Sequence, residues 1–351
     1  MNIKLIKNEN PRTLPPLEQI GFGNHFTNHM FTMDYSVDIG WHNARIEPYG
    51  DLVLSPSTMS LHYGQEIFEG LKAFSTPRGV LLFRPEENMK RMNISCDRIC
   101  IPPIDEEFVL SALKQLVDLD RDWVPPYEGA SLYIRPFIFA TDAHLGVRPS
   151  RTHKFMIIMS PGTAYLAGGL TPVKIYVEDK YVRACKGGVG TAKTGGNYAS
   201  SLKAQKEAAE KGFAQVLWLD GAERKYVEEV GTMNVAFVIG DKVVTPALNG
   251  SILAGITRKS VIEILKKNGI EVEERELSID ELVEAHKKGE FKEAFGTGTA
   301  ASISPIGLLH YKGYDMDIGD TAGAITTMVY NELVGLQYGT VEDTYGWTVV
   351  V

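Results

Sequence analysis

The order of hydrophobic and polar residues predicts both strands and helices in the first half of the chain. Short apolar runs bounded by turn residues are typical of strands, whereas apolar positions that recur every three or four residues are typical of helices. The strand-like runs cover residues 52–54, 80–83, 132–135 and 154–159. The helix-like stretches cover residues 86–98 and 106–120. The first half is therefore expected to form an α+β fold.

The second half mixes the same two patterns. Strands are expected over residues 173–177 and 215–221, and a hairpin over 236–245 turns at Gly240 and Asp241. Helices are expected over residues 197–212 and from 255 to 269, because each stretch ends at a glycine. A capping box over residues 278–281 predicts the start of another helix.

Residues 162–172 separate two of these predicted strands and are rich in glycine and small residues, as interdomain linkers are. The chain has 351 residues, enough for two cores. We expect a smaller N-terminal α+β domain over 1–163, a linker over 164–172, and a larger C-terminal domain over 173–351. That C-terminal domain would carry Lys193, the candidate reactive lysine discussed below.

Composition and charge limit the classes of molecule that this chain is expected to bind. The chain carries a net charge of -8 and no block of lysine and arginine, which argues against nucleic acid or an anionic membrane as the main partner. No apolar stretch approaches the roughly 18 residues of a membrane span, and the first ten residues lack a secretory signal. Three cysteines are too few for a disulfide framework. We expect a small-molecule substrate and a cytoplasmic location.

The run over residues 187–198 places Lys193 among glycines, with Tyr198 five residues later. Glycines permit positive φ and let a flat ligand lie close to the backbone. A lysine amine can form a Schiff base with an aldehyde, and removal from water lowers its pKa toward the range in which it carries protons. The run by itself is equally compatible with a flexible, solvated loop.

A second feature indicates an anion site. A helix that begins at residues 255–257 would direct its free N–H groups at an anion, and the Thr257 hydroxyl adds a donor. Residues 296–301 satisfy the dinucleotide pattern G-x-G-x-x-A, but Pro305 and Gly307 stand where that pattern requires a helix. Residues 190–196 lack the lysine that a P-loop has after its second glycine. We therefore expect no nucleotide cradle.

No metal site is expected either. His25 and His29 share a helical spacing, but no glutamate lies between them and no other ligand cluster is near.

Seven short motifs occur in a fixed order across nearly the full length of the chain. They are residues 62–70, 88–91, 132–136, 193–198, 229–234, 255–258 and 296–300. Together they resemble the motifs of branched-chain amino-acid aminotransferases, which are pyridoxal-phosphate enzymes of fold type IV. The resemblance implies a mixed α/β fold of two domains. It also implies reversible transfer of the amino group between L-leucine, L-isoleucine or L-valine and 2-oxoglutarate, giving branched-chain 2-oxo acids and L-glutamate.

The resemblance assigns roles around the cofactor. Lys193 would hold pyridoxal phosphate as a Schiff base and carry the proton in transamination. Glu229 would face the pyridine nitrogen and keep it protonated, and Tyr198 would lie near O3′. The remaining cofactor-binding residues, the phosphate ligands among them, would be Arg91, Thr232, Ile256, Thr257 and Thr299. Without the resemblance, Glu229 and Arg91 would be interpreted as solvated surface charges and Tyr198 as core packing.

The resemblance also assigns the substrate site. The α-carboxylate would meet the backbone amides around Thr299 and Ala300 and the hydroxyl of Tyr133. Arg135 would pair with the γ-carboxylate of glutamate, because burying an unpaired charge is costly. The apolar wall would comprise Phe22, Tyr63, Phe68 and Tyr165, joined by Leu145 and Val147 from the neighbouring subunit of a homodimer.

Two other interpretations stay open. One is another fold type IV enzyme, a D-amino-acid transaminase or an aminodeoxychorismate lyase; Tyr133, Arg135 and the turn at Gly296 favour the branched-chain interpretation. The other is a non-catalytic sensor that binds pyridoxal phosphate or an amino acid, which would gain little from keeping Lys193 and Glu229. A cysteine pair that serves some relatives as a redox switch is replaced by Ala301 and Ser304, and Cys185 has no visible partner. Thiol regulation there is not expected.

Overall fold

The computed structural model describes residues 1–127, 129–163 and 169–351. They form two compact units. Unit 1 comprises Met1–Tyr165, Ala192–Gly195 and Leu336–Val351, and unit 2 comprises Leu166–Thr191 and Gly196–Gly335. Residues 164–168 of the expected linker lie outside the described residues. Two segments depart from the expected division, since 192–195 and 336–351 belong to unit 1 rather than to a C-terminal domain.

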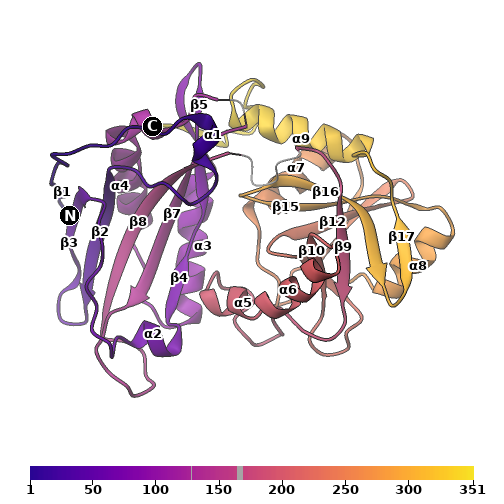
Figure 1. The fold of residues 1–351 in the computed structure, drawn as a ribbon, viewed down its shortest axis with the longest axis horizontal. Helices are drawn as coiled ribbons and strands as arrows, with labels where there is room; N and C mark the ends of the chain where they lie inside the picture. The colour runs from indigo at the N-terminus through magenta and orange to yellow at the C-terminus, as the bar shows by residue number, and fades with distance from the viewer. Residues whose placement is uncertain (128, 164–168) are drawn as a thin grey trace. The chain divides into compact units, whose positions relative to one another are not determined.

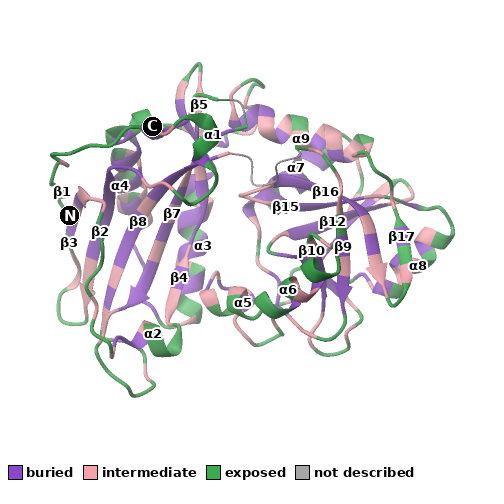
Figure 2. Ribbon diagram, in the orientation of Figure 1, coloured by how far each residue is buried: buried purple, intermediate pink, exposed green. Residues whose placement is uncertain are grey.

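Unit 1 is built on one mixed sheet whose central strands are largely buried (Figures 1 and 2). The strand order is β1-β3-β2-β8-β7-β5-β6-β18, and β4 also pairs with β7. The bounds are β1 Lys4–Leu5, β2 His29–Ser36, β3 Gly40–Pro48, β4 Glu66–Phe68, β5 Leu71–Thr76, β6 Gly79–Phe83, β7 Ser131–Ala140, β8 Thr152–Gly162 and β18 Thr348–Val350. Strand β18 explains why the C-terminus belongs to this unit, because it pairs with β6.

The helices of unit 1 confirm the apolar periodicity. They are α1 Leu17–Ile20, α2 Met59–Tyr63, α3 Pro85–Arg98, α4 Glu106–Leu119 and the 3-10 turn Arg121–Trp123. Helix α3 has Pro85 in its first turn and α4 is capped by the Asp105 side chain, both common start signals. The apolar faces of α3 and α4 pack on one face of the sheet, against core residues such as Leu132, Ile134 and Ile138. The alternate residues of β7 point to the other face.

Unit 2 is built on a second mixed sheet, with strand order β11-β10-β9-β16-β15-β12-β13-β14 and β17 beside β16. The bounds are β9 Val173–Glu178, β10 Gln215–Leu219, β11 Val227–Val230, β12 Asn234–Ile239, β13 Lys242–Pro246, β14 Val272–Arg275, β15 Phe291–Gly298, β16 Ser302–Tyr311 and β17 Tyr314–Asp317. The predicted hairpin is β12–β13, with its turn at Gly240. Strand β16 directly follows the glycine turn at 296–300, so the rejection of the dinucleotide pattern is confirmed.

The helices of unit 2 are α5 Gly195–Ala199, α6 Leu202–Glu210, α7 Ile256–Lys267, α8 Ile279–Lys287 and α9 Ala324–Gln337. Helix α5 begins, and helix α9 ends, on residues of unit 1. The capping box is confirmed, because the Ser278 hydroxyl accepts the Glu281 N–H at 3.1 Å. No helix among the described residues is long and apolar enough to cross a membrane.

Two predicted elements are wrong. Residues 52–54 form no strand, and Val53 is 99% exposed. An apolar run is not stabilised as a strand unless it pairs with a neighbouring strand. The helix expected over 197–212 is broken between α5 and α6. At the break, the Ser200 and Ser201 hydroxyls bond to the carbonyls of Asn197 and Tyr198, and such local bonds compete with the helix.

Candidate active site

The segment that carries Lys193 is held within unit 1 by hydrogen bonds to β4 and α3. The Lys193 N–H donates to the Ser95 hydroxyl at 2.9 Å, and the Lys193 carbonyl accepts the Phe68 N–H at 2.9 Å. The Thr194 hydroxyl donates to the Glu66 carbonyl at 2.6 Å, and the Gly195 N–H donates to the Glu66 carboxylate. A Cβ at Gly195 would collide with that carboxylate, so only glycine fits. The lysine backbone is therefore fixed rather than loose, which overturns the flexible-loop interpretation.

The Lys193 amine lies in a charged but poorly hydrated place. Its Nζ is 4.7 Å from the centroid of the Phe68 ring. Burial is the main cause that lowers the pKa of Lys193 to about 8; the positive charge of Arg91 acts in the same direction, while Glu69 opposes the shift. Because an ordinary lysine titrates near 10.4, a far larger fraction of this amine is neutral near pH 7.

Arg91, on α3, forms a buried ion pair with Glu69. Its Nε and Nη2 each donate to Glu69 at 2.7 Å, in a two-pronged geometry that fixes the guanidinium plane. Glu69 also accepts the Asn88 amide at 2.8 Å. Both charges are almost fully buried, so the interpretation of Arg91 as a solvated cation on a helix surface is wrong. Sequence reasoning did not identify Glu69 as its partner.

Four predicted substrate residues, Phe22, Phe68, Tyr133 and Arg135, gather on the face of the unit 1 sheet opposite α3 and α4. The Arg135 guanidinium lies 4.5 Å from the Phe68 ring centroid and 5.3 Å from that of Tyr133. Its Nη2 donates to the Tyr133 hydroxyl at 3.1 Å. The Phe22 ring meets Tyr133 edge to face at 5.2 Å. These residues therefore combine an aromatic surface with one cation, as a site for both aliphatic and anionic groups requires.

The other residues of unit 1 that were predicted to form the apolar substrate wall are more exposed to solvent. The Tyr63 hydroxyl donates to the Leu145 carbonyl, which links α2 to the loop after β7. Tyr63 is 41%, Leu145 64% and Val147 83% exposed. Tyr165 lies outside the described residues.

In unit 2, Glu229 is buried on β11. Its Oε2 lies 3.0 Å from Nε of Arg183, and its Oε1 accepts the Leu253 N–H at 2.8 Å. Glu228, the preceding residue, points to the opposite side of the strand, accepts the Ser251 hydroxyl, and is equally buried. Burial raises the pKa of Glu228, although the Ser251 hydroxyl opposes the shift. The interpretation of this acidic pair as solvated is wrong for both residues.

The start of α7 provides free backbone donors. Gly255, the residue before the helix, has no side chain to cap it, and the first turn holds no acidic residue. A Cβ at Gly255 would collide with the Asn234 side-chain oxygen, so the site excludes a larger residue. Thr257 is buried in this first turn. Uncapped N–H groups and the helix dipole together suit a phosphate.

The remaining predicted residues of unit 2 lie on helix ends and turns. Ile256 is the first residue of α7, and Tyr198 is half-buried on α5. Thr232 is exposed in the turn between β11 and β12. Thr299 and Ala300 are half-buried in the turn between β15 and β16.

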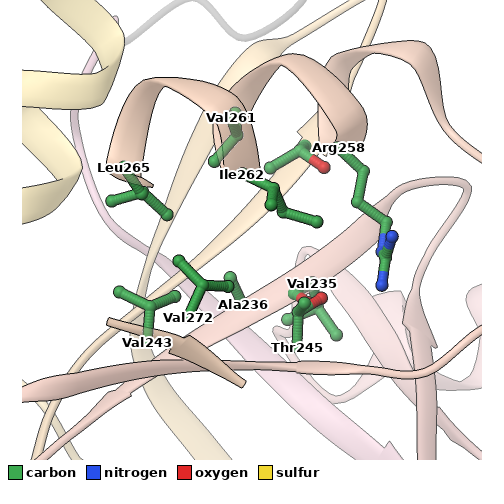
Figure 3. Close-up of a pocket in the computed structure, with 10 residues that line it drawn as sticks. Val235, Ala236, Val243, Thr245, Arg258, Val261, Ile262, Leu265 and Val272 are labelled. Carbon is green, nitrogen blue, oxygen red and sulfur yellow. The ribbon is translucent and has the colours of Figure 1, made fainter. Parts of the chain in front are cut away.

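A small pocket elsewhere in unit 2 is not a substrate site. Figure 3 shows it beneath α7, where Val261, Ile262 and Leu265 face the strands of the sheet. It has room for about one water molecule. None of the predicted site residues lines it. The Arg258 side chain at its edge is fixed by the Pro246 carbonyl at 2.9 Å and by Glu274 at 3.0 Å.

His29 of the histidine pair has a structural partner. Its Nδ1 lies 2.7 Å from Asp120, and its Nε2 accepts the Asn8 N–H at 3.0 Å. Among the described residues, no group of three His, Cys, Asp or Glu side chains could hold a metal ion.

Residues 66–309 match the model of the family described as amino-transferase class IV. The chain belongs to the class IV aminotransferase family. This aminotransferase is 56% identical over 354 residues to "Branched-chain-amino-acid aminotransferase 2" of Bacillus subtilis (strain 168), covering 100% of this chain and 97% of the relative.

Solved structures of branched-chain amino acid aminotransferases have the same fold. The Escherichia coli structure matches with a TM-score of 0.78 and 29% identity, covering 92% of this chain and 98% of that one. Two structures of the T.th. enzyme match with a TM-score of 0.75 and cover 91% of this chain and 98% of theirs. One is complexed with N-(5'-phosphopyridoxyl)-L-glutamate, at 28% identity, and the other with 4-methylvaleric acid, at 27%. The predicted fold type IV architecture is confirmed.

The residues of this aminotransferase fit pyridoxal phosphate, the cofactor of the family. Each unit, taken by itself, has groups of the kind that this cofactor uses. Unit 1 has an amine of lowered pKa, as an aldehyde requires, and unit 2 has an uncapped helix start with a threonine and a buried carboxylate, as a phosphate and a ring nitrogen require.

Four residues that contact the predicted site residues or their segment were not singled out from the sequence. Ser95 and Glu66 bond to the segment that carries Lys193, Glu69 pairs with Arg91, and Arg183 pairs with Glu229. A fifth, Lys72, lies opposite Tyr133 in the neighbouring strand, and burial lowers its pKa to about 8. Glu66 and Glu69 had a local signal, because both lie within the first of the seven motifs. The others depend on contacts between residues far apart in the chain.

Proposed function

We propose that this aminotransferase is a branched-chain-amino-acid transaminase that exchanges the amino group between L-leucine, L-isoleucine or L-valine and 2-oxoglutarate. The observation that carries the proposal is the surface made by Lys193, Arg135 and the Phe68 ring. It offers a lysine of low pKa, an apolar ring and one cation within unit 1. The Bacillus subtilis relative at 56% identity over the full chain supports the same substrate class.

Lys193 is the proposed catalytic residue. When bound, pyridoxal phosphate supplies an aldehyde that accepts the substrate amino group and a ring that stabilises negative charge at the substrate Cα. The Lys193 amine would hold the cofactor covalently, and in its free form it would carry the proton of the substrate Cα. A pKa of about 8 suits both tasks, because the amine is then neutral often enough to accept a proton and acidic enough to return it.

The residues of unit 2 are proposed to hold the cofactor. Within unit 2, the start of α7, with Ile256 and Thr257, would bind the phosphate together with Thr299, and Thr232 would be a further cofactor-binding residue. Arg91, in unit 1, is also proposed as a phosphate ligand. Glu229 would keep the ring nitrogen protonated, and its ion pair with Arg183 orients the carboxylate. Tyr198 would donate its hydroxyl to the ring oxygen.

Recognition of the substrate is proposed to depend on unit 1. The Tyr133 hydroxyl and the amides at Thr299 and Ala300 would bind the α-carboxylate. Phe22, Tyr63 and Phe68, with Tyr165, would line the aliphatic pocket, and Arg135 would receive the γ-carboxylate of glutamate.

We also propose a homodimer, because the aminotransferase exposes apolar residues around α2 and the loop after β7. They are Leu52, Val53, Leu61, Leu145 and Val147. Such a patch is typical of a protein–protein interface, and Leu145 and Val147 would complete the substrate wall of the neighbouring subunit. Sedimentation equilibrium tests it; a monomer at micromolar concentration would contradict it.

A cytoplasmic location is proposed on the state of the cysteines. Cys96, Cys100 and Cys185 are all free thiols. A reducing compartment suits them.

The function is tested by the absorbance of the purified protein between about 300 and 500 nm after pyridoxal phosphate is supplied. L-leucine should convert the aldehyde band to that of the amine form, and 2-oxoglutarate should restore it, since each is one half-reaction. D-alanine is the control. A response to D-alanine alone would assign a D-amino-acid transaminase, and failure to bind the cofactor would contradict the proposed function.

A further inference from the structure

Glu66 is a charged residue on the proposed substrate face to which neither the family resemblance nor the proposed mechanism gives a role. It lies on β4 two residues before Phe68, so both side chains point to the same face of the sheet. The Lys193 Nζ lies 4.7 Å from the centroid of the Phe68 ring, and the Arg135 guanidinium carbon lies 4.5 Å from it. Glu66 therefore brings a negative charge to a surface that is otherwise aromatic and cationic.

The Glu66 carboxylate is held in place. It accepts the Gly195 N–H, and its backbone carbonyl accepts the Thr194 hydroxyl at 2.6 Å. Burial raises the pKa of Glu66, while the Gly195 N–H and the positive charge of Arg135 both oppose that shift. The carboxylate thus acts on Arg135 through space from a fixed position.

Arg135 lacks a direct counter-ion. Within the part of the chain that the structure describes, no carboxylate lies within ion-pair distance of its guanidinium, and its buried Nε has no hydrogen-bond partner. Tyr133 and the Phe68 ring are its contacts. Glu66 supplies a compensating charge for Arg135 from beyond ion-pair distance.

We propose that Glu66 determines the balance between acidic and aliphatic substrates by partly neutralising Arg135. This inference rests on the proposed function of the site. With an aliphatic side chain bound, Arg135 has no carboxylate partner at ion-pair distance among the described residues, and the Glu66 charge offsets the cost of that half-buried cation. With glutamate or 2-oxoglutarate bound, the same charge repels the second carboxylate. Glu66 acts through Arg135 and is a positioning residue for specificity, not a catalytic one.

The experiment compares two unreactive probes on the holoenzyme at about pH 8.5 by isothermal titration calorimetry. Glutarate is 2-oxoglutarate without its oxo group, and 4-methylvalerate is leucine without its amino group. Glu66→Gln keeps an acceptor for the Gly195 N–H and removes the charge. We expect it to raise the affinity for glutarate relative to 4-methylvalerate by about ten-fold. The matched control Glu47→Gln, on β3 and paired with Arg45, should leave that ratio unchanged.

Two further variants keep the result interpretable. Glu66→Ala removes the charge by a second route and should shift the ratio in the same direction. In an Arg135→Gln background, Glu66→Gln should no longer change the ratio, because the residue through which it acts is gone. A ratio that stays within two-fold of wild type in both Glu66 variants, or that moves toward 4-methylvalerate, overturns the proposal. If wild-type holoenzyme binds neither probe and does not respond to L-leucine, the proposed function itself fails.

Discussion

Unit 1 and unit 2 both have charged residues among the predicted site residues, but they compensate those charges differently. In unit 2, Glu229 has a cation at 3.0 Å and a backbone N–H at 2.8 Å. In unit 1, Lys193 has a lowered pKa and Arg135 has no carboxylate at ion-pair distance among the described residues. Compensated groups suit a ligand that stays bound, whereas a cation without a nearby carboxylate suits anionic substrates that exchange. This difference agrees with the proposed roles, in which Glu229 of unit 2 contacts the cofactor and Arg135 of unit 1 contacts the substrate.

The Arg91–Glu69 pair differs from the other charged site residues of unit 1. It lies in unit 1 but is as fully compensated as Glu229, with two bonds of 2.7 Å. Consistent with that division, the resemblance assigns Arg91 to the cofactor and not to the substrate.

Removal of the reacting amine is expected to have the largest effect. Lys193→Ala should lower the rate of amino transfer from L-leucine to 2-oxoglutarate by about a thousand-fold or more, because both the covalent hold and the proton carrier are lost. Unit 2 should still bind the cofactor, as measured by its absorbance after gel filtration. Lys90→Ala, an exposed lysine on α3, is the control. Activity within ten-fold of wild type would remove Lys193 from the mechanism.

Loss of a buried partner should be the next largest effect. Glu69→Ala leaves Arg91 buried without its counter-ion, which costs about 3–5 kcal/mol of folding free energy. Asp118→Ala, which breaks the exposed pair with Arg121, should cost less than about 1 kcal/mol. Urea unfolding followed by tryptophan fluorescence measures both. Equal losses in the two variants would show that burial of the Arg91 pair has no special role.

The two adjacent carboxylates of β11 test whether the predicted role in the reaction belongs to Glu229 alone. Glu229→Gln should lower kcat by about a hundred-fold, because a charge that stabilises the reaction is replaced by a neutral amide of the same shape. Glu228→Gln changes the same atoms on the opposite side of the strand and should leave kcat within about two-fold. Steady-state kinetics of both variants measures the contrast. A larger loss in Glu228→Gln would reverse the assignment of the two acids.

The pKa of Lys193 predicts a pH profile. The neutral amine is the form that reacts with an aldehyde, and a pKa lowered to about 8 makes it available at lower pH than an ordinary lysine. Trapping of the apoprotein with pyridoxal phosphate and borohydride should therefore rise through about pH 8 at Lys193, but only near pH 10.4 at exposed lysines. Peptide mass spectrometry gives each midpoint. A midpoint above about 10 at Lys193 would contradict the burial of its amine.

The smallest expected effect on kcat comes from the hydrogen bond that holds the backbone of Lys193. Ser95→Ala removes the hydroxyl that accepts the Lys193 N–H, and kcat should fall by about three- to ten-fold, since loss of one buried hydrogen bond is modest. Ser95→Thr keeps the hydroxyl and should restore most of the rate. An unchanged kcat in Ser95→Ala would show that the bonds to β4 hold the lysine segment without α3.

Local patterns were sufficient for most of the helices. Asp105 and Ser278 cap α4 and α8 where the sequence placed their starts, and Gly240 turns the β12–β13 hairpin. The run at 52–54 failed because apolar character alone does not supply a partner strand. The helix at 197–212 failed because the Ser200 and Ser201 hydroxyls bond to local carbonyls, a choice that periodicity does not reveal.

The amino-acid sequence by itself determined the family and the helix that starts at residues 255–257, and it singled out Lys193 as the candidate reactive lysine, because each depends on short motifs of residues that are neighbours in the chain. Only the tertiary structure decided what surrounds them. Ser95 lies 98 positions before Lys193, and Glu66 lies 129 before Gly195. Whether a carboxylate such as Glu229 is solvated or buried depends on contacts across such separations. The pKa of the lysine and the compensation of each charge therefore follow from packing, which no short stretch of sequence records.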